Sequence, residues 1–131
     1  VDLAWRCNRQ GFILVTDAMA ALGMPPGRYR LGEFTVRVNS LSARLDDGTL
    51  AGSILTMDVA LRNLMQFTGC TLGEALPALA ENPARLLGLE NKGRLAPGAD
   101  ADLVLLTPAG EVMMTLVGGE VVYSRASHFA A

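Results

Sequence analysis

The stretch Phe12-Ile13-Leu14-Val15-Thr16-Asp17 decides the fold that this sequence predicts. Four consecutive apolar residues, two of them β-branched, indicate a short strand that is buried on both faces, because a half-exposed strand would alternate with polar residues. The strand is preceded by a segment typical of a helix that ends near Gly11. A helix followed by a buried strand is the repeating unit of a parallel α/β fold.

Asp17 is the first candidate for a functional residue, because it stands where the predicted strand leaves its sheet. In parallel α/β folds, ligands and chemistry collect at the carboxyl ends of the strands. The alternative is that Thr16 or Asp17 only caps a following helix over residues 18–22, since both residue types are common N-caps. The spacing alone leaves both interpretations open.

Composition limits the classes of protein that remain. The 131 residues suit one ordinary domain, and half of them are hydrophobic, so a sizeable core can form. Mean hydropathy is +0.31, yet no apolar run approaches the roughly 18 residues that a membrane helix needs. A net charge of −2 without a basic cluster argues against nucleic acid as a partner. Cys7 and Cys70 are far apart, which fits reduced thiols in a cytoplasmic protein.

The rest of the chain divides into a β region, helices and a second β region. Residues 28–50 predict a small antiparallel insertion, with alternation over 34–38 and an Asp46-Asp47-Gly48 hairpin turn. A helix is expected to follow from residues 51–58, with Ser53 or Thr56 as its cap. Two more are expected, one after the capping box at Thr71 and one from Asn82 as cap with Pro83 in the first position. Strands at 101–107, 111–117 and 120–123 follow, with a hairpin at 118–119. Three strands cannot bury much alone and need partners.

Several blocks of residues resemble known families. The closing blocks are similar to the end of the amidohydrolase superfamily, while the earlier blocks resemble the carboxyl-terminal third of N-acetylglucosamine-6-phosphate deacetylases more narrowly. The earlier blocks are Val15-Thr16-Asp17-Ala18, Gly48-Thr49-Leu50-Ala51-Gly52-Ser53 and Arg62-Asn63-Leu64. The closing blocks are Asn82-Pro83-Ala84-Arg85-Leu86-Leu87-Gly88 and the run from Gly93 to Val104.

The resemblance implies an α/β fold that is part of a larger one. Residues 1–92 would be the C-terminal part of a (β/α)8 TIM-type barrel, with the last strand, the closing helices and the inserted β-hairpin region. Residues 93–131 would add the C-terminal strands of a small β-sandwich and a tail. The chain starts at Val1 without Met, as a piece of a longer protein would. We therefore expect the partner strands to lie upstream.

By the same resemblance, Asp17 is the general base and acid of a metal-dependent amide hydrolysis. Leu50, Ala51 and Gly52 match the loop that lines a sugar-phosphate pocket, although they could also be a plain helix-entry loop. The divalent metal, Zn or Fe, would be held by a Glu and histidines upstream of Val1, so no metal ligand is expected in this chain. His128, the single histidine, lies in a polar tail and is expected to be solvent-exposed.

The resemblance predicts a cytoplasmic enzyme of amino-sugar catabolism that releases acetate and glucosamine-6-phosphate. Its expected partner is a sugar phosphate, with no nucleic acid or membrane partner. The full-length form is expected to be a homodimer. The isolated 131 residues are expected to be inactive. The alternatives are another amidohydrolase, acting on N-acetylgalactosamine-6-phosphate or resembling dihydroorotase, and a non-catalytic interaction module.

Overall fold

The structure, a computed structural model, describes residues 1–39 and 42–125, so His128 lies outside the described residues. The chain is α/β, with helices and two antiparallel sheets. It divides into two units, Val1–Leu14 with Leu61–Ala131, and Val15–Ala60. Each unit has a hydrophobic cluster of its own, and each is considered by itself below.

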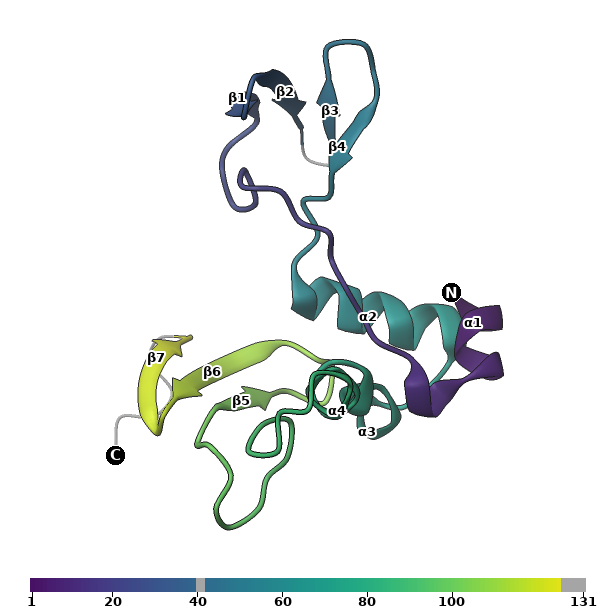
Figure 1. The fold of residues 1–131 in the computed structure, drawn as a ribbon, viewed down its shortest axis with the longest axis vertical. Coiled ribbons are helices and arrows are strands. Elements are labelled where there is room, and N and C mark those ends of the chain that lie inside the picture. The colour runs from purple at the N-terminus through teal and green to yellow at the C-terminus, as the bar shows by residue number, and fades with distance from the viewer. Residues whose placement is uncertain (40–41, 126–131) are drawn as a thin grey trace. The chain divides into compact units, whose positions relative to one another are not determined.

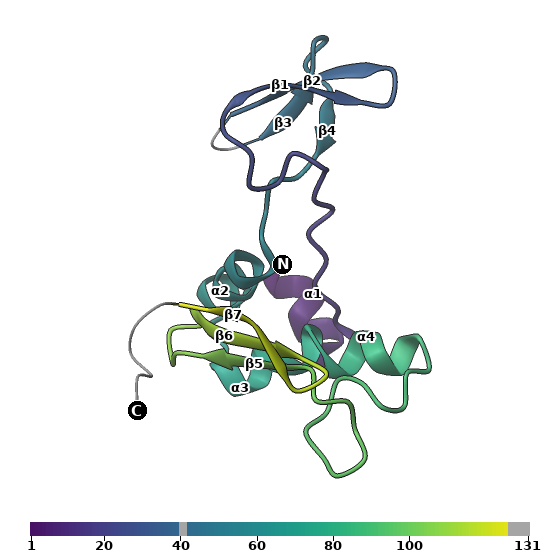
Figure 2. The ribbon, with the colours of Figure 1, turned by 90° about the vertical axis from the view of Figure 1, so that its left-hand side faces the viewer.

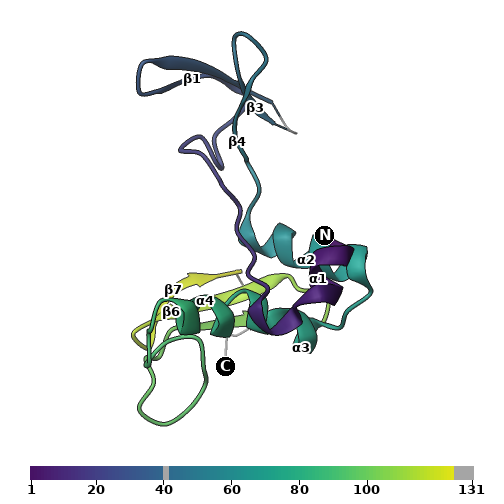
Figure 3. The same ribbon diagram turned by 45° about the vertical axis from the view of Figure 1, so that its right-hand side comes forward.

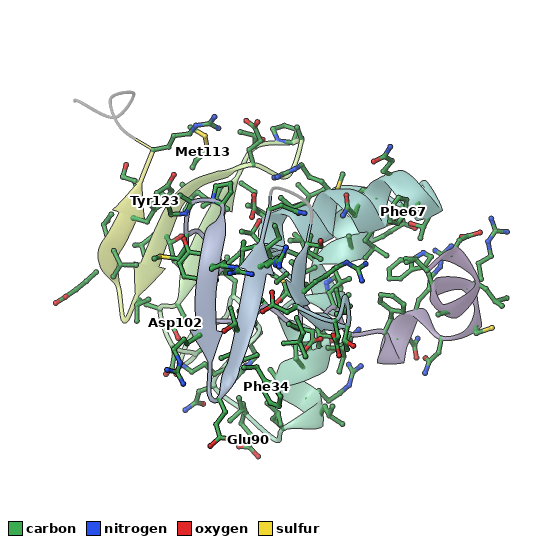
Figure 4. All side chains as sticks on the ribbon, turned by 90° about the horizontal axis from the view of Figure 1, so that it is seen from above. Phe34, Phe67, Glu90, Asp102, Met113 and Tyr123 are labelled. Carbon is green, nitrogen blue, oxygen red and sulfur yellow. The ribbon has the colours of Figure 1, made fainter. Side chains whose placement is uncertain are left out.

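The unit of Val15–Ala60 is a four-stranded antiparallel sheet in the order β1-β2-β3-β4 (Figures 1 and 2). Its strands are β1 (Gly27–Leu31), β2 (Phe34–Val38), β3 (Ala43–Leu45) and β4 (Leu50–Gly52). The predicted alternation is confirmed, because Val36 and Val38 are fully or nearly buried while Arg37 between them is exposed. Phe34 stands at the end of the β1–β2 hairpin and is 61% exposed (Figure 4).

The other unit combines helices with a three-stranded sheet, β5-β6-β7 (Figure 3). Its cluster contains Trp5 from α1 (Asp2–Cys7), Leu61 and Leu64 from α2 (Met57–Thr68), and Ala75 from α3 (Leu72–Ala75). Trp5 is 2% exposed and meets Phe12 edge-on, with ring centroids 5.4 Å apart. The remaining elements are η1 (Arg9–Gly11), η2 (Leu76–Ala78), α4 (Glu81–Leu86), β5 (Leu103–Leu106), β6 (Val112–Val117) and β7 (Glu120–Ser124).

The three closing strands and the capping box are confirmed. Thr71 accepts a hydrogen bond from the backbone N–H of Glu74, and the Glu74 carboxylate accepts one from the N–H of Thr71. Pro77 limits α3 to one turn and passes the chain into η2, because it lacks the N–H that a longer α-helix would use. Strand β7 is exposed along its whole length, as expected of strands that need partners.

The buried strand over residues 12–16 is wrong for this chain. Residues 12–17 belong to neither sheet of the described residues, and Val15 is 72% exposed. The peptide groups of a parallel strand must hydrogen-bond to neighbouring strands. Here, peptide groups of this segment hydrogen-bond to other parts of the chain. The Leu14 N–H donates to the carbonyl of Ala78, and the Phe12 carbonyl accepts from Asn82.

Two helix predictions are wrong, and a third is settled between its alternatives. Residues 18–22 form no helix but a bridge and a turn. Helix α2 begins at Met57, directly after Thr56, whereas Ser53, the other predicted cap, follows strand β4. Asn82 is not the cap of α4, which begins one residue earlier at Glu81. The Asn82 side chain is buried and instead donates to the Phe12 carbonyl at 2.7 Å. A buried amide must be hydrogen-bonded, and this bond meets that need.

Candidate functional site

Asp17 lies in a left-handed backbone conformation, with φ of +49°. Among the described residues it is the only residue other than glycine with a positive φ. Aspartate tolerates this region better than most residues, but the conformation is still sparsely populated and is enriched at functional sites. A helix N-cap normally has extended dihedrals, so the capping interpretation of Asp17 is wrong.

Strand β4 brings the second set of predicted site residues beside Asp17. Gly52 has φ of +130°, and a Cβ built on it would lie 3.2 Å from the Asp17 carbonyl oxygen and 3.2 Å from the Met19 Cβ. The glycine therefore permits a backbone approach that a side chain would obstruct. Asp17 and Gly52 are 35 positions apart in the sequence, yet their backbones lie against each other in the unit of Val15–Ala60.

Strand β4 is irregular at the same place. Ala43 pairs with Gly52 and Arg44 pairs with Leu50, so Ala51 is the extra residue of a β-bulge. A bulge leaves its extra residue outside the regular ladder and re-aims the neighbouring side chains, and bulges are common beside active sites. The interpretation of Leu50, Ala51 and Gly52 as a plain helix-entry loop is therefore wrong, because they form a bulged strand.

Ser53 fastens β4 to the segment that carries Asp17. Its N–H donates to the Asp17 carbonyl at 2.8 Å, and its carbonyl accepts from the Met19 N–H at 2.9 Å. Its hydroxyl donates to the Thr16 carbonyl and accepts from the Leu55 N–H at 3.1 Å. From the sequence, Ser53 was only a possible helix cap. Its contact with Asp17 joins residues 36 positions apart, and local sequence patterns do not predict such a contact.

The other carboxylates of the hairpin serve the sheet. Asp46 accepts from Arg37 at 2.7 Å and from Arg28 at 3.1 Å, and the hydrogen bond from Arg37 is the main reason that the pKa of Asp46 is lowered. Asp47 accepts from the Thr49 N–H at 2.8 Å, which lowers the pKa of Asp47. Both residues belong to the turn between β3 and β4, as predicted.

The described residues do not by themselves fit a metal ion. Within residues 1–39 and 42–125, no group of three His, Cys, Asp or Glu side chains gathers in a way that could hold one. The same ranges contain no helix with the length and hydropathy to cross a bilayer.

Comparisons with known proteins show the family to which the chain belongs. The model of the amidohydrolase family matches residues 9–122. The chain belongs to the amidohydrolase family. A relative from Homo sapiens, named N-acetylglucosamine-6-phosphate deacetylase, is 47% identical over 92% of this chain and 30% of its own length.

Two solved structures of this amidohydrolase group resemble the chain closely. The N-acetylglucosamine-6-phosphate deacetylase of Thermotoga maritima is 41% identical with a TM-score of 0.86, over 94% of this chain and 34% of that one. An Asp-to-Ala variant of the deacetylase from Mycobacterium smegmatis, in complex with N-acetyl-D-glucosamine-6-phosphate, is 39% identical with a TM-score of 0.80. It is matched over 88% of this chain and 32% of that one. This chain spans less than a third of the length of the human relative.

Proposed function

We propose that this chain is the carboxyl-terminal portion of a cytoplasmic N-acetylglucosamine-6-phosphate deacetylase. The observation that supports it is the meeting of Asp17, in its left-handed conformation, with the bulged end of β4 at Gly52. These two segments are the ones that resemble the deacetylases most narrowly, and similarity to proteins of that name covers most of the chain. The reaction would hydrolyse the N-acetyl group to acetate and glucosamine-6-phosphate.

Asp17 would act as general base and then as general acid. Its carboxylate takes a proton from the attacking water as the water oxygen bonds to the acetyl carbonyl carbon. The protonated carboxyl then gives that proton to the amine nitrogen as the carbon–nitrogen bond breaks. Asp17 is exposed in this unit, so its carboxylate is accessible to a substrate.

Leu50, Ala51 and Gly52 would line the sugar-phosphate pocket. The bulge takes the peptide groups of its extra residue out of the regular ladder, so those groups can serve a polar ligand. Gly52 has no side chain, so its backbone lies directly against the Asp17 carbonyl and Met19, and the bulge is held next to the Asp17 segment. This assignment puts the substrate against the same bulge that holds the Asp17 segment.

The placement in a larger fold is also a proposal. Residues 12–16 would become the last strand of a (β/α)8 barrel once neighbouring strands from the longer protein supply their backbone partners. Residues 1–92 would complete the barrel, and residues 93–131 would join a β-sandwich that covers β7. A homodimer is proposed for the full-length form.

The proposed reaction uses a divalent metal, Zn or Fe. The described residues contain no group of side chains that could hold such an ion. Such an ion would have to be held by residues outside this chain. The described residues would still bind the sugar and move the proton. We therefore expect the 131 residues alone to hydrolyse no substrate above the rate in buffer, and an amide-hydrolysis rate from them would contradict the proposal.

The test is an activity assay of the full-length protein with Asp17→Asn. The variant removes the proton acceptor while keeping size and shape, so we expect kcat to fall by about 10²- to 10⁴-fold, the usual range for general acid–base catalysis. Asp47→Asn is the matched control, because it changes the same residue type in the same unit and keeps an oxygen to accept from Thr49. A kcat of Asp17→Asn within threefold of wild type, roughly 0.7 kcal/mol in barrier, would refute the role.

The substrate is tested with the acetylated phosphates of glucosamine and galactosamine, each given to the wild-type protein. A higher kcat/KM for the glucosamine compound supports the proposal. A higher value for the galactosamine compound, or activity only on a cyclic amide, would assign a different amidohydrolase. No activity on any amide in metal-loaded protein would favour a non-catalytic interaction module.

A further inference from the structure

Both peptide groups that flank Asp17 are hydrogen-bonded to one residue, Ser53. The Thr16 carbonyl, in the peptide before Asp17, accepts from the Ser53 hydroxyl. The Asp17 carbonyl, in the peptide after it, accepts from the Ser53 N–H at 2.8 Å. The Met19 N–H donates to the Ser53 carbonyl at 2.9 Å, which continues the contact as a parallel bridge between Ala18 and Ser53.

This arrangement restrains the backbone on both sides of Asp17. The φ and ψ angles of a residue describe how its two flanking peptide planes are turned relative to each other. Since Ser53 holds one plane through its side chain and the other through its backbone, it holds the angle between them. The direction of the Asp17 Cα–Cβ bond follows from those two angles, and the side-chain rotamers then place the carboxylate around that bond.

The conformation needs such a restraint because it is unfavourable by itself. A residue other than glycine rarely adopts φ of +49°, and such a conformation persists where its surroundings hold it. The backbone N–H of Ser53 can reach the Asp17 carbonyl because Gly52 has no side chain in the way. The Ser53 hydroxyl is itself oriented, since it accepts from the Leu55 N–H at 3.1 Å while it donates to Thr16.

We propose that Ser53 is a positioning residue that sets the direction of the Asp17 carboxylate by hydrogen-bonding both peptide groups around it. Ser53 touches no reacting atom in this scheme and acts only through Asp17. The inference rests on the proposed role of Asp17 in proton transfer. Its structural part, the restraint on the Asp17 backbone, stands independently of any activity.

The experiment compares three variants of the full-length protein. Ser53→Ala removes the hydroxyl and keeps the backbone contacts, while Ser53→Thr keeps a hydroxyl. Ser42→Ala is the matched control, because Ser42 lies in the same unit and its hydroxyl only reaches the Asn39 carboxamide oxygen at 3.5 Å. For each protein, kcat and KM are measured on the acetylated sugar phosphate, and a crystal structure gives the Asp17 backbone.

For Ser53→Ala we expect Asp17 to leave its left-handed conformation or to occupy a second one. Its kcat should fall at least about tenfold with KM within about twofold, since misplacing a catalytic group by about 1 Å can cost 10²-fold. Ser53→Thr should keep kcat within about threefold, near 0.7 kcal/mol in barrier, and Ser42→Ala should match wild type.

Two outcomes would overturn the inference. An unchanged Asp17 backbone in Ser53→Ala would do so whatever happens to the rate, and a displaced Asp17 with unchanged kcat would do so as well. The crystal structure also separates this inference from the proposed function. A wild-type protein without deacetylase activity contradicts the proposed function, whereas the Asp17 backbone in Ser53→Ala still decides whether Ser53 holds it.

Discussion

Replacement of Gly52 by alanine tests how closely β4 approaches the segment of Asp17. The new Cβ would lie 3.2 Å from the Asp17 carbonyl oxygen and 3.2 Å from the Met19 Cβ, so either neighbour must move by a few tenths of an ångström. The residue must also keep φ of +130°, which side chains rarely allow. Both effects act in the folded state and destabilise it.

The expected size follows from three contributions. A strained backbone costs about 1–3 kcal/mol, and crowding in a packed position costs about 1–3 kcal/mol more. Alanine also restricts the unfolded chain, which returns about 0.4–1 kcal/mol. The net loss in the free energy of unfolding should therefore lie between roughly 1 and 5 kcal/mol. A displaced Asp17 should lower kcat in the same variant.

The assay is urea denaturation of the full-length protein, read beside two control variants. Gly48→Ala also has a positive φ, +87°, but its Cβ would meet nothing within 4 Å, so it reports backbone strain alone. Gly73→Ala lies in the helix α3 with open space around it and should be neutral or stabilising by up to about 1 kcal/mol. If Gly52→Ala costs no more than Gly48→Ala, the close approach to Asp17 is refuted.

Two further predictions concern the other unit. Asn82→Ala leaves the Phe12 carbonyl without its buried donor, so the free energy of unfolding, measured by urea denaturation, should fall by about 1–3 kcal/mol. Asn91→Ala, at an exposed position, is the control and should be neutral. Equal effects of the two variants would contradict the role of the buried Asn82 hydrogen bond. The ion pair of Lys92 lowers the pKa of Asp102, so this pair stabilises the fold above the ordinary Asp pKa of about 3.9 and the contribution is lost as the pH falls below it. Asp102→Asn should therefore flatten the decrease in Tm between about pH 4 and pH 2, and an unchanged slope would contradict the linkage.

The local patterns of the sequence were sufficient for the sheets. Alternation at Val36 and Val38 predicted β2, and the Asp46-Asp47-Gly48 turn predicted the β3–β4 hairpin, because both are set by neighbours along the chain. The three closing strands were predicted for the same reason. The involvement of Asp17 and Gly52 in one site came from resemblance, and the structure places their backbones together.

What the sequence could not show depends on distant partners. Residues 12–16 have the composition of a buried strand, but a strand exists only where other strands accept its hydrogen bonds, and the described residues offer none there. Asn82 has the composition of a helix cap, yet its amide is used 70 positions away at the Phe12 carbonyl. The bulge at Ala51 and the contacts of Ser53 have no local signature, since they depend on how β3 and the Asp17 segment meet β4.

The buried indole of Trp5 gives this chain a spectroscopic label in one unit alone. Trp5 is the single tryptophan of the sequence, it is 2% exposed, and the Arg9 guanidinium carbon lies 5.4 Å from its ring centroid. Its fluorescence reports the hydrophobic cluster of α1, α2 and α3, whereas the four-stranded sheet around Val36 contains only Tyr29 as a weaker emitter. Unfolding curves followed by tryptophan emission and by far-ultraviolet circular dichroism coincide only if the two units unfold together. A separation between the curves would give the stability of the unit that contains Asp17 as a quantity of its own.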